Sequence, residues 1–224
     1  MNLLREAALV AGKDLRIEVR SRVTVQQILP FGLVVLLLFA FALDPHSGTL
    51  SKAAPGVFWI TVLFAALLAI GRSFSIEAEN GARDGLRLSG LDSAALFLGK
   101  AGAVVIELAA LEALLAAGVV LLFNVGLGGA LPLALATVAA TVGVAATGTL
   151  YGVLAAGLRV RETLLPVLLL PVVAPVLLGA TRAWEAAISG ASSDAWPWVA
   201  LLGIFAVLFT GIGMLAFGPL LEES

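Results

Sequence analysis

Residues 131–158 read LPLALATVAATVGVAATGTLYGVLAAGL, a stretch without a single charged side chain. An α-helix needs about 20 mostly apolar residues to cross the hydrocarbon core of a bilayer, so this stretch predicts a transmembrane helix. Five further apolar runs lie at Ile28–Leu43, Val57–Gly71, Ala95–Phe123, Thr163–Ala180 and Pro197–Phe217. The sequence therefore predicts an all-α, polytopic membrane protein with six transmembrane helices.

Basic residues are distributed unequally between the connections of these six helices. Cytoplasmic connections of membrane proteins are enriched in lysine and arginine. When the connections are numbered alternately, one side holds 11 of the 13 basic residues and the other holds Lys52 and Arg182. We therefore expect both termini in the cytoplasm, an N-in/C-in topology. The larger group consists of Arg5, Lys13, Arg16, Arg20, Arg22, Arg72, Arg83, Arg87, Lys100, Arg159 and Arg161.

The composition leaves little of the chain outside the membrane. Apolar residues make up 61% and charged residues 12% of the 224 residues, and the mean hydropathy is +1.09. Soluble domains contain about 25% charged residues. We expect a cytoplasmic helix at 1–27, a transmembrane domain at 28–218 with a cytoplasmic segment at 72–94, and a cytoplasmic tail at 219–224. The absence of cysteine excludes thiolate metal sites and cysteine nucleophiles.

Residues 1–27 have the pattern of a basic amphipathic helix. Apolar residues recur every three or four positions, as along one face of an α-helix, and Lys13, Arg16 and Arg20 share another face. Such a helix lies in the interface of the lipid bilayer, where anionic head groups attract it. The alternative is a topology signal with no further role. The apolar stripe consists of Leu4, Ala8, Ala11, Leu15, Val19 and Val23.

The predicted cytoplasmic segment at 72–94 mixes apolar side chains with charges of both signs. This mixture favours a docking surface for another protein over a merely solvated loop. Asn80-Gly81 and Ser89-Gly90 are turn signals, so we expect two short helices separated by a turn. We expect Asp92 or Ser93 to cap the following span. The candidate docking residues are Arg72, Phe74, Glu77, Glu79, Arg83 and Arg87.

The chain contains no nucleotide-binding loop of the form G-x-x-x-x-G-K-[ST]. Its nearest approach, Gly99-Lys100-Ala101, lacks both the earlier glycine and the hydroxyl that would contact magnesium. We therefore expect no catalytic residue in this chain. If ATP drives the protein, a separate subunit must bind the ATP and its magnesium. We expect no nucleic-acid partner.

Two carboxylates and three prolines lie inside predicted spans. A charge at the bilayer centre costs at least about 2.5–3.5 kcal/mol, so Glu107 and Glu112 are candidates for proton or substrate handling. Hydrogen bonding within the bundle is the alternative, and Glu107 could also pair with Lys100. His46, the single histidine, is a candidate ligand for a haem iron, with a solvated loop side chain as the alternative, and we expect no other metal site. A kinked helix, static or lining a pathway, is predicted by Pro166, Pro171 and Pro175.

Small and aromatic residues give two further expectations. Gly148 and Gly152 are four positions apart, a spacing that lets two membrane helices approach closely. Tryptophan is enriched at membrane interfaces, so the four tryptophans are expected at the outer surface of the bilayer. They are Trp59, Trp184, Trp196 and Trp198.

Several of these motifs together resemble the CcmB-type haem exporter family of cytochrome c biogenesis. The first half of the chain resembles it through Ala54-Pro55-Gly56-x-x-Trp59, Arg72-x-Phe74-x-x-Glu77-x-x-x-Gly81 and Gly99-Lys100. The second half is similar through Arg159-x-Arg161-Glu162-x-Leu164-Leu165-Pro166 and the two prolines that follow it. The resemblance covers most of the chain.

The resemblance implies the membrane subunit of an ABC-type transporter in the bacterial plasma (inner) membrane, acting in cytochrome c maturation. The implied partners are an ATP-binding subunit, a multi-span haem-handling membrane protein, a small single-span subunit and an extracytoplasmic haem chaperone. The resemblance is also compatible with two copies of the chain per complex. ATP hydrolysis would drive haem export or the release of a haem-loaded chaperone, so haem is a candidate cargo and no cofactor is assigned to the chain. Other interpretations are an ABC permease for a glycan, lipid or drug, a proton-coupled carrier using Glu107 and Glu112, and a passive scaffold.

Overall fold

The computed structural model describes residues 2–22, 24–43, 48–79, 90–126, 128–156 and 161–223. These ranges contain helices and no strand, which confirms the all-α prediction. The helices are α1 (Leu3–Ser21), a short π-helical turn (Thr24–Ile28), α2 (Leu29–Ala42), α3 (Thr49–Glu79), α5 (Ser93–Phe123), α6 (Ala130–Ala156), α7 (Arg161–Ile188) and α8 (Ser192–Glu223).

Five of these helices, α3, α5, α6, α7 and α8, are long and apolar enough to cross a membrane. The remaining predicted span, α2, has 14 residues. That length corresponds to about 21 Å of helix, against a hydrocarbon core of about 30 Å. Helices α1 and α2 are separated by a bend. If the two are counted together as one span, the structure has six spans. Because α1 carries charges along its length, α2 is the part of this pair that suits the hydrocarbon core.

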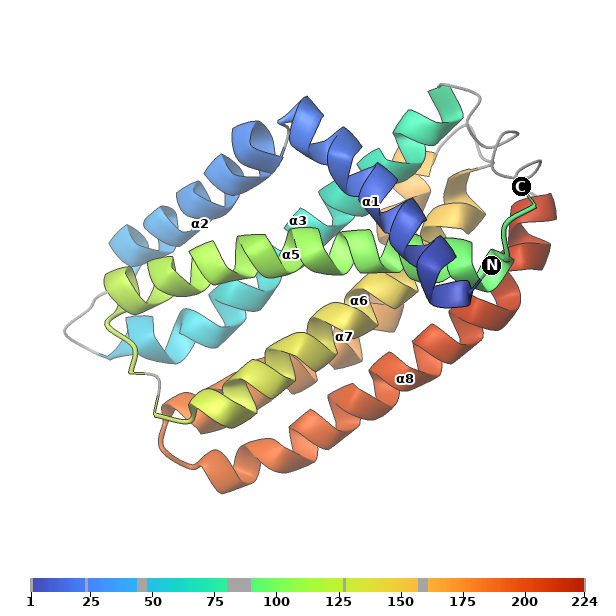
Figure 1. Ribbon diagram of the computed structural model, residues 1–224. Coiled ribbons are helices and arrows are strands. Elements are labelled where there is room, and N and C mark those ends of the chain that lie inside the picture. Colours follow the sequence, from blue (N-terminus) through green and yellow to red (C-terminus); the bar gives the residue numbers. More distant parts are fainter. Residues whose placement is uncertain are drawn as a thin grey trace.

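The helices pack into one bundle in which α6, α7 and α8 contact one another and α3 and α5 complete the core. Helix α2 lies against α3 and α5, and α1 crosses the outer side of α5 (Figure 1). Both ends of the chain lie at the same end of the bundle (Figure 1), as an even number of crossings requires. The side of the membrane that this end faces is still a prediction from the basic residues.

The close contact predicted at Gly148 and Gly152 is confirmed. A Cβ atom at Gly148 would collide with the side chain of Ile70, and one at Gly152 would collide with the ring of Phe74. The missing side chains therefore let α6 approach α3 closely. This contact fixes the position of Phe74, which belongs to the site described below.

Helix α3 differs from the prediction of two short helices after the second span. It continues without a break through Arg72 to Glu79, so the first of the two predicted helices is not a separate element. No glycine or proline lies between Arg72 and Glu79, and the helical hydrogen-bond pattern can therefore run on. Helix α3 thus reaches well beyond its apolar part.

Two of the four tryptophans expected at the membrane interface have buried side chains. Trp59 and Trp184 are only 1% and 2% exposed. Trp184 stacks on Phe58 with ring centroids 4.1 Å apart, and its Nε1 donates to Thr137 Oγ1 at 2.9 Å. The indole N–H of Trp184 thus has a partner inside the bundle and does not need a head group. Trp196 and Trp198 are exposed, as an interfacial position requires.

Candidate coupling site where α1 meets α3 and α5

Helix α1 turns its acidic residues toward the bundle. Glu6 is buried together with Ala7 and Val10, and Asp14 and Glu18 are partly buried. The spacing of eight and four residues between the three acids places them on one side of the helix. This acidic side was not singled out in the sequence, where the apolar stripe and the basic residues dominate the pattern.

Much of the remaining surface of α1 faces away from the bundle. Leu4 and Val19, which belong to the predicted apolar stripe, are 73% and 78% exposed, whereas Ala11 and Leu15 of the same stripe are partly buried. The basic residues Arg5, Arg16 and Arg20 are exposed as well. Contact with the bundle therefore depends on the acidic side of α1, and the apolar and basic sides remain accessible.

A glycine on α5 brings α1 very close. A Cβ atom at Gly99 would lie 2.6 Å from Val10 Cβ and 2.7 Å from the carbonyl oxygen of Ala7. Real Cβ atoms do not approach other atoms to this extent, so a larger residue at this position would push α1 away. Gly99 thus sets the distance between the two helix backbones.

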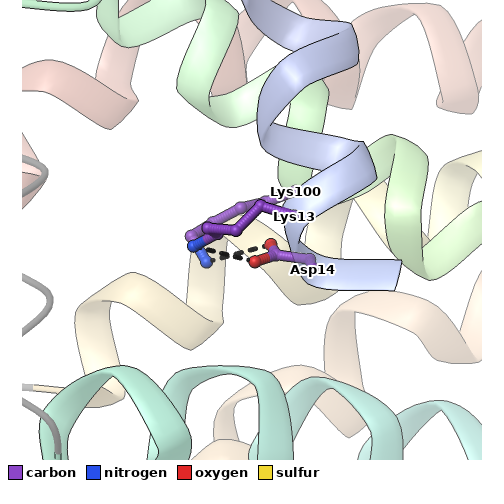
Figure 2. A network of polar contacts seen from close by, with 3 residues as sticks. All are labelled: Lys13, Asp14 and Lys100. Carbon is purple, nitrogen blue, oxygen red and sulfur yellow. Dashed lines mark hydrogen bonds and ion pairs between the residues drawn. The ribbon is translucent and has the colours of Figure 1, made fainter. Parts of the chain in front are cut away.

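Next to Gly99, Lys100 forms the centre of a polar cluster. Its Nζ lies 3.4 Å from Asp14 Oδ2, and Lys13 Nζ lies 2.9 Å from Asp14 Oδ1. Figure 2 shows both ammonium groups directed at the one carboxylate. Lys100 Nζ also lies 5.0 Å from the centroid of the Phe74 ring, within the range of a cation–π contact. Lys100 therefore connects α5 with α1 and with the end of α3.

Two further contacts extend this connection. Arg72 Nε on α3 lies 3.3 Å from Glu18 Oε2, which is an ion-pair distance although the N–H is not aligned for a hydrogen bond. At the other end of α1, Glu6 Oε2 accepts a hydrogen bond from the backbone amide of Asp92 at 3.1 Å. The Asp92 side chain in turn accepts from Ala94 N at 2.8 Å and caps α5, as predicted.

These contacts bind α1 to both helices that border residues 80–89. We call the set the α1 clamp, and its members are Glu6, Asp14, Glu18, Arg72, Asp92 and Lys100. The Lys100 side chain is only 3% exposed, and a buried charge is costly unless a partner of opposite sign is present. Asp14, itself 12% exposed, supplies that partner. The clamp therefore joins α1 to the end of α3 and to the start of α5.

The predicted docking residues relate to the clamp in different ways. Arg72 is a member of the clamp, and the ring of Phe74 contacts Lys100. Glu77 and Glu79 belong to the last turn of α3, but their side chains lie outside the described residues. Arg83 and Arg87 also lie outside the described residues. The clamp thus holds the base of the predicted docking segment, and the role of the segment itself is still a prediction.

Glu112, one of the two intramembrane acids, joins α5 to α6. Its two carboxylate oxygens lie 2.7 and 2.8 Å from Thr141 Oγ1, and its side chain is buried. Thr141 Oγ1 also lies 2.8 Å from the carbonyl oxygen of Thr137. Glu107 is partly buried on another side of α5. The Glu112 contact supports hydrogen bonding within the bundle, which was one of the two interpretations of these acids.

The predicted roles of the three prolines and of His46 are still predictions. The three prolines lie within α7, which is continuous from Arg161 to Ile188, so a bend or pathway there is still a prediction. His46 lies outside the described residues. Among the described residues, no three acidic, histidine or cysteine side chains are grouped as a metal site would need.

Comparison with known proteins gives one consistent result. The sequence profile of a family described as CcmB protein matches residues 5–224. The chain is 30% identical over 214 residues to "Heme exporter protein B" of Paracoccus denitrificans, covering 92% of each chain. It is 31% identical over 175 residues to the protein of the same name from Bradyrhizobium diazoefficiens, covering 78% of each. It is also 31% identical over 182 residues to that of Haemophilus influenzae, covering 78% of this chain and 79% of the other.

Proposed function

The chain belongs to the CcmB protein family, and on this premise we propose that it is the membrane permease component of a haem exporter serving cytochrome c biogenesis. The match over residues 5–224 carries this proposal, because it includes nearly the whole chain. The five or six helices suited to membrane crossing support a multi-pass position in the bacterial plasma membrane. The chain itself contributes no catalytic group in this proposal.

A separate ATP-binding subunit supplies the energy. The chain has no nucleotide-binding loop, so ATP and magnesium bind to that partner. The partner docks on residues 72–92, where Glu77, Glu79, Arg83 and Arg87 offer charges of both signs. A haem-handling multi-span protein, a small single-span subunit and an extracytoplasmic haem chaperone complete the machinery, with two copies of this chain as the expected number.

The α1 clamp explains how movement of the partner would reach the bundle. A displacement of residues 80–89 pulls on the end of α3 and on the start of α5. Because α1 is bonded to both through Glu18, Asp14 and Glu6, the two ends move together. The displacement then becomes a rigid-body movement of α3 and α5 against α6, α7 and α8. In this scheme, haem export or release of a haem-loaded chaperone follows from that movement.

A different cargo would leave the scheme unchanged. A glycan, lipid or drug permease would use the same clamp and the same partner. Loss of c-type cytochromes after deletion of the gene distinguishes the haem proposal from these alternatives, because only the haem pathway supplies cytochrome c. A deletion strain with normal c-type cytochromes would point to another cargo.

Co-purification with the ATP-binding subunit tests the docking step. The double charge reversal Glu77→Arg/Arg83→Glu should abolish recovery of the ATPase while the protein still inserts into the membrane. The matched control is Arg182→Glu/Glu185→Arg, which reverses an exposed ion pair of 2.8 Å near the opposite end of the bundle. The control should retain the ATPase. Equal recovery of the ATPase with both variants would refute docking at this segment. Failure of any ATPase to co-purify with the wild-type protein would favour a carrier that works without ATP.

A further inference from the structure

The outward side of α1 carries a cleft that the clamp does not use. It is lined by Leu15, Arg16, Ile17, Val19, Arg20 and Arg22. Among the described residues, none of the three guanidinium groups in this set has an ion-pair partner. The cleft therefore combines three available positive charges with apolar walls at the last turns of α1.

The position of the cleft relative to the membrane follows from the chain that leaves it. Arg22 ends α1 in a left-handed conformation with φ 55°, and the π-helical turn and α2 follow directly. Helix α2 exposes large apolar side chains such as Leu38 (62%) and Phe41 (88%), which only lipid can cover favourably. The chain thus enters the hydrocarbon core immediately after the cleft, and the three arginines lie at the level of the lipid head groups.

The apolar side chains that line the cleft indicate which type of ligand it binds. Val19 is 78% exposed and Ile17 is 37% exposed, directly beside Arg16 and Arg20. A free phosphate ion would satisfy the guanidinium groups but would leave these side chains in water. A phospholipid covers both, because its phosphate binds arginine and its acyl chains contact the apolar residues.

We propose that this cleft is a binding site for an anionic phospholipid, with Arg16, Arg20 and Arg22 around the phosphate and Leu15, Ile17 and Val19 against the upper acyl chains. Asp14 and Glu18 connect these helix turns to the bundle, and the proposed site lies on the opposite, outward side of the same turns. Arg16 and Arg20 repel each other across one turn, which weakens the helix. A bound phosphate removes this repulsion, and the lipid thereby stabilises the same turns on which the α1 clamp depends.

Native mass spectrometry of the full-length protein in a neutral detergent tests the site. Phosphatidylglycerol and phosphatidylcholine with identical acyl chains are titrated separately. The wild-type protein should bind phosphatidylglycerol more tightly, because only this lipid has a net negative charge. The double variant Arg16→Gln/Arg20→Gln should bind phosphatidylglycerol about 30-fold more weakly, since each arginine near the membrane surface contributes about a fivefold factor. Its binding of phosphatidylcholine should stay within about twofold.

The matched control removes two arginines elsewhere. Arg5→Gln/Arg182→Gln loses the same charge, but Arg5 lies about 16 Å from Arg16 along α1 and Arg182 lies near the other end of the bundle. This variant should bind phosphatidylglycerol as the wild type does, within about twofold. An equal loss in both double variants would overturn the proposal, since the effect would then come from net charge alone.

Two further measurements distinguish a bound lipid from other ligands. Val19→Ser should weaken phosphatidylglycerol binding several-fold, and inorganic phosphate at millimolar concentration should not displace the lipid. Displacement by phosphate would show a simple anion site and refute the lipid. If the arginine double variant instead keeps its lipids and loses a protein that co-purifies with the wild type, the cleft is a protein contact and the proposal is wrong.

Discussion

The ammonium nitrogen of Lys100 lies 3.4 Å from a carboxylate oxygen of Asp14, a residue 86 positions earlier in the chain. Only 3% of the Lys100 side chain is exposed. Removing one partner of a buried ion pair leaves an uncompensated charge, whereas replacing both partners by apolar residues is often neutral. The attachment of α1 to α5 therefore depends on Asp14 and Lys100 as a pair, which leads to a first prediction.

Asp14→Asn should destabilise the protein by about 1–3 kcal/mol, because the buried Lys100 loses its ion pair with Asp14. Lys13→Gln serves as the control, since the Lys13 side chain is 40% exposed and its ion pair should contribute less than about 1 kcal/mol. The double variant Asp14→Leu/Lys100→Met should be more stable than Asp14→Asn. Denaturant unfolding of the purified protein in detergent measures all three. Equal losses for Asp14→Asn and Lys13→Gln would contradict the assignment.

The helix contact at Gly99 gives a second prediction. Gly99→Ala should cost about 1–3 kcal/mol, because the new methyl group meets the backbone of Ala7 and the Cβ of Val10 and α1 has to move. Gly102→Ala on the same helix has no atom within 4 Å of its Cβ position and should be neutral or stabilising by up to about 1 kcal/mol. Thermal unfolding of the two variants side by side provides the comparison. If Gly102→Ala were the more harmful change, the close approach of α1 would be disproved.

Glu112 and Thr141 provide a third prediction. Glu112→Gln should be tolerated within about 1 kcal/mol, because an amide can donate to the Thr141 hydroxyl while that hydroxyl donates to the Thr137 carbonyl. Thr141→Val should cost about 2 kcal/mol, since it leaves a buried carboxyl group without this partner. Stability and cytochrome c maturation are both measured. A stable Glu112→Gln protein that has lost all activity would support the proton-coupled carrier instead.

The orientation of the chain in the membrane gives a fourth prediction, and the absence of cysteine in the chain makes it simple to test. A single cysteine at Ser189, in the exposed connection between α7 and α8, should react with a membrane-impermeant maleimide added to intact cells. A single cysteine at Arg83 should react only after the membrane is permeabilised, because the basic connections are expected in the cytoplasm. Reaction of the Arg83→Cys protein in intact cells would reverse the predicted topology.

The positions of the five long helices could be predicted because the bilayer imposes their length. Runs such as residues 131–158 have no alternative to a helix in a medium without water, and α6 covers almost this range. Helix α2 was harder to predict. Its apolar residues indicate a span, but 14 residues of helix fall short of the usual length.

The clamp could not be predicted because it joins residues that are distant in the sequence. Nothing local identifies Asp14 as the partner of Lys100, and helical spacing alone suggests only Glu107 on the same helix. The signal that was available is the common side of Glu6, Asp14 and Glu18 on α1. The burial of Trp59 and Trp184 could not be predicted either, because it depends on aromatic packing with Phe58.

The sorting of charge on α1 has a consequence for the order of assembly. The helix has four basic and three acidic residues, so by itself it is almost neutral and a poor ligand for an anionic surface. When its carboxylates contact Lys100, Arg72 and the Asp92 amide, the outward surface of the helix carries basic and apolar side chains. Since α1 is synthesised before α3 and α5, we expect its binding to an anionic membrane surface to strengthen only after these two helices have been inserted.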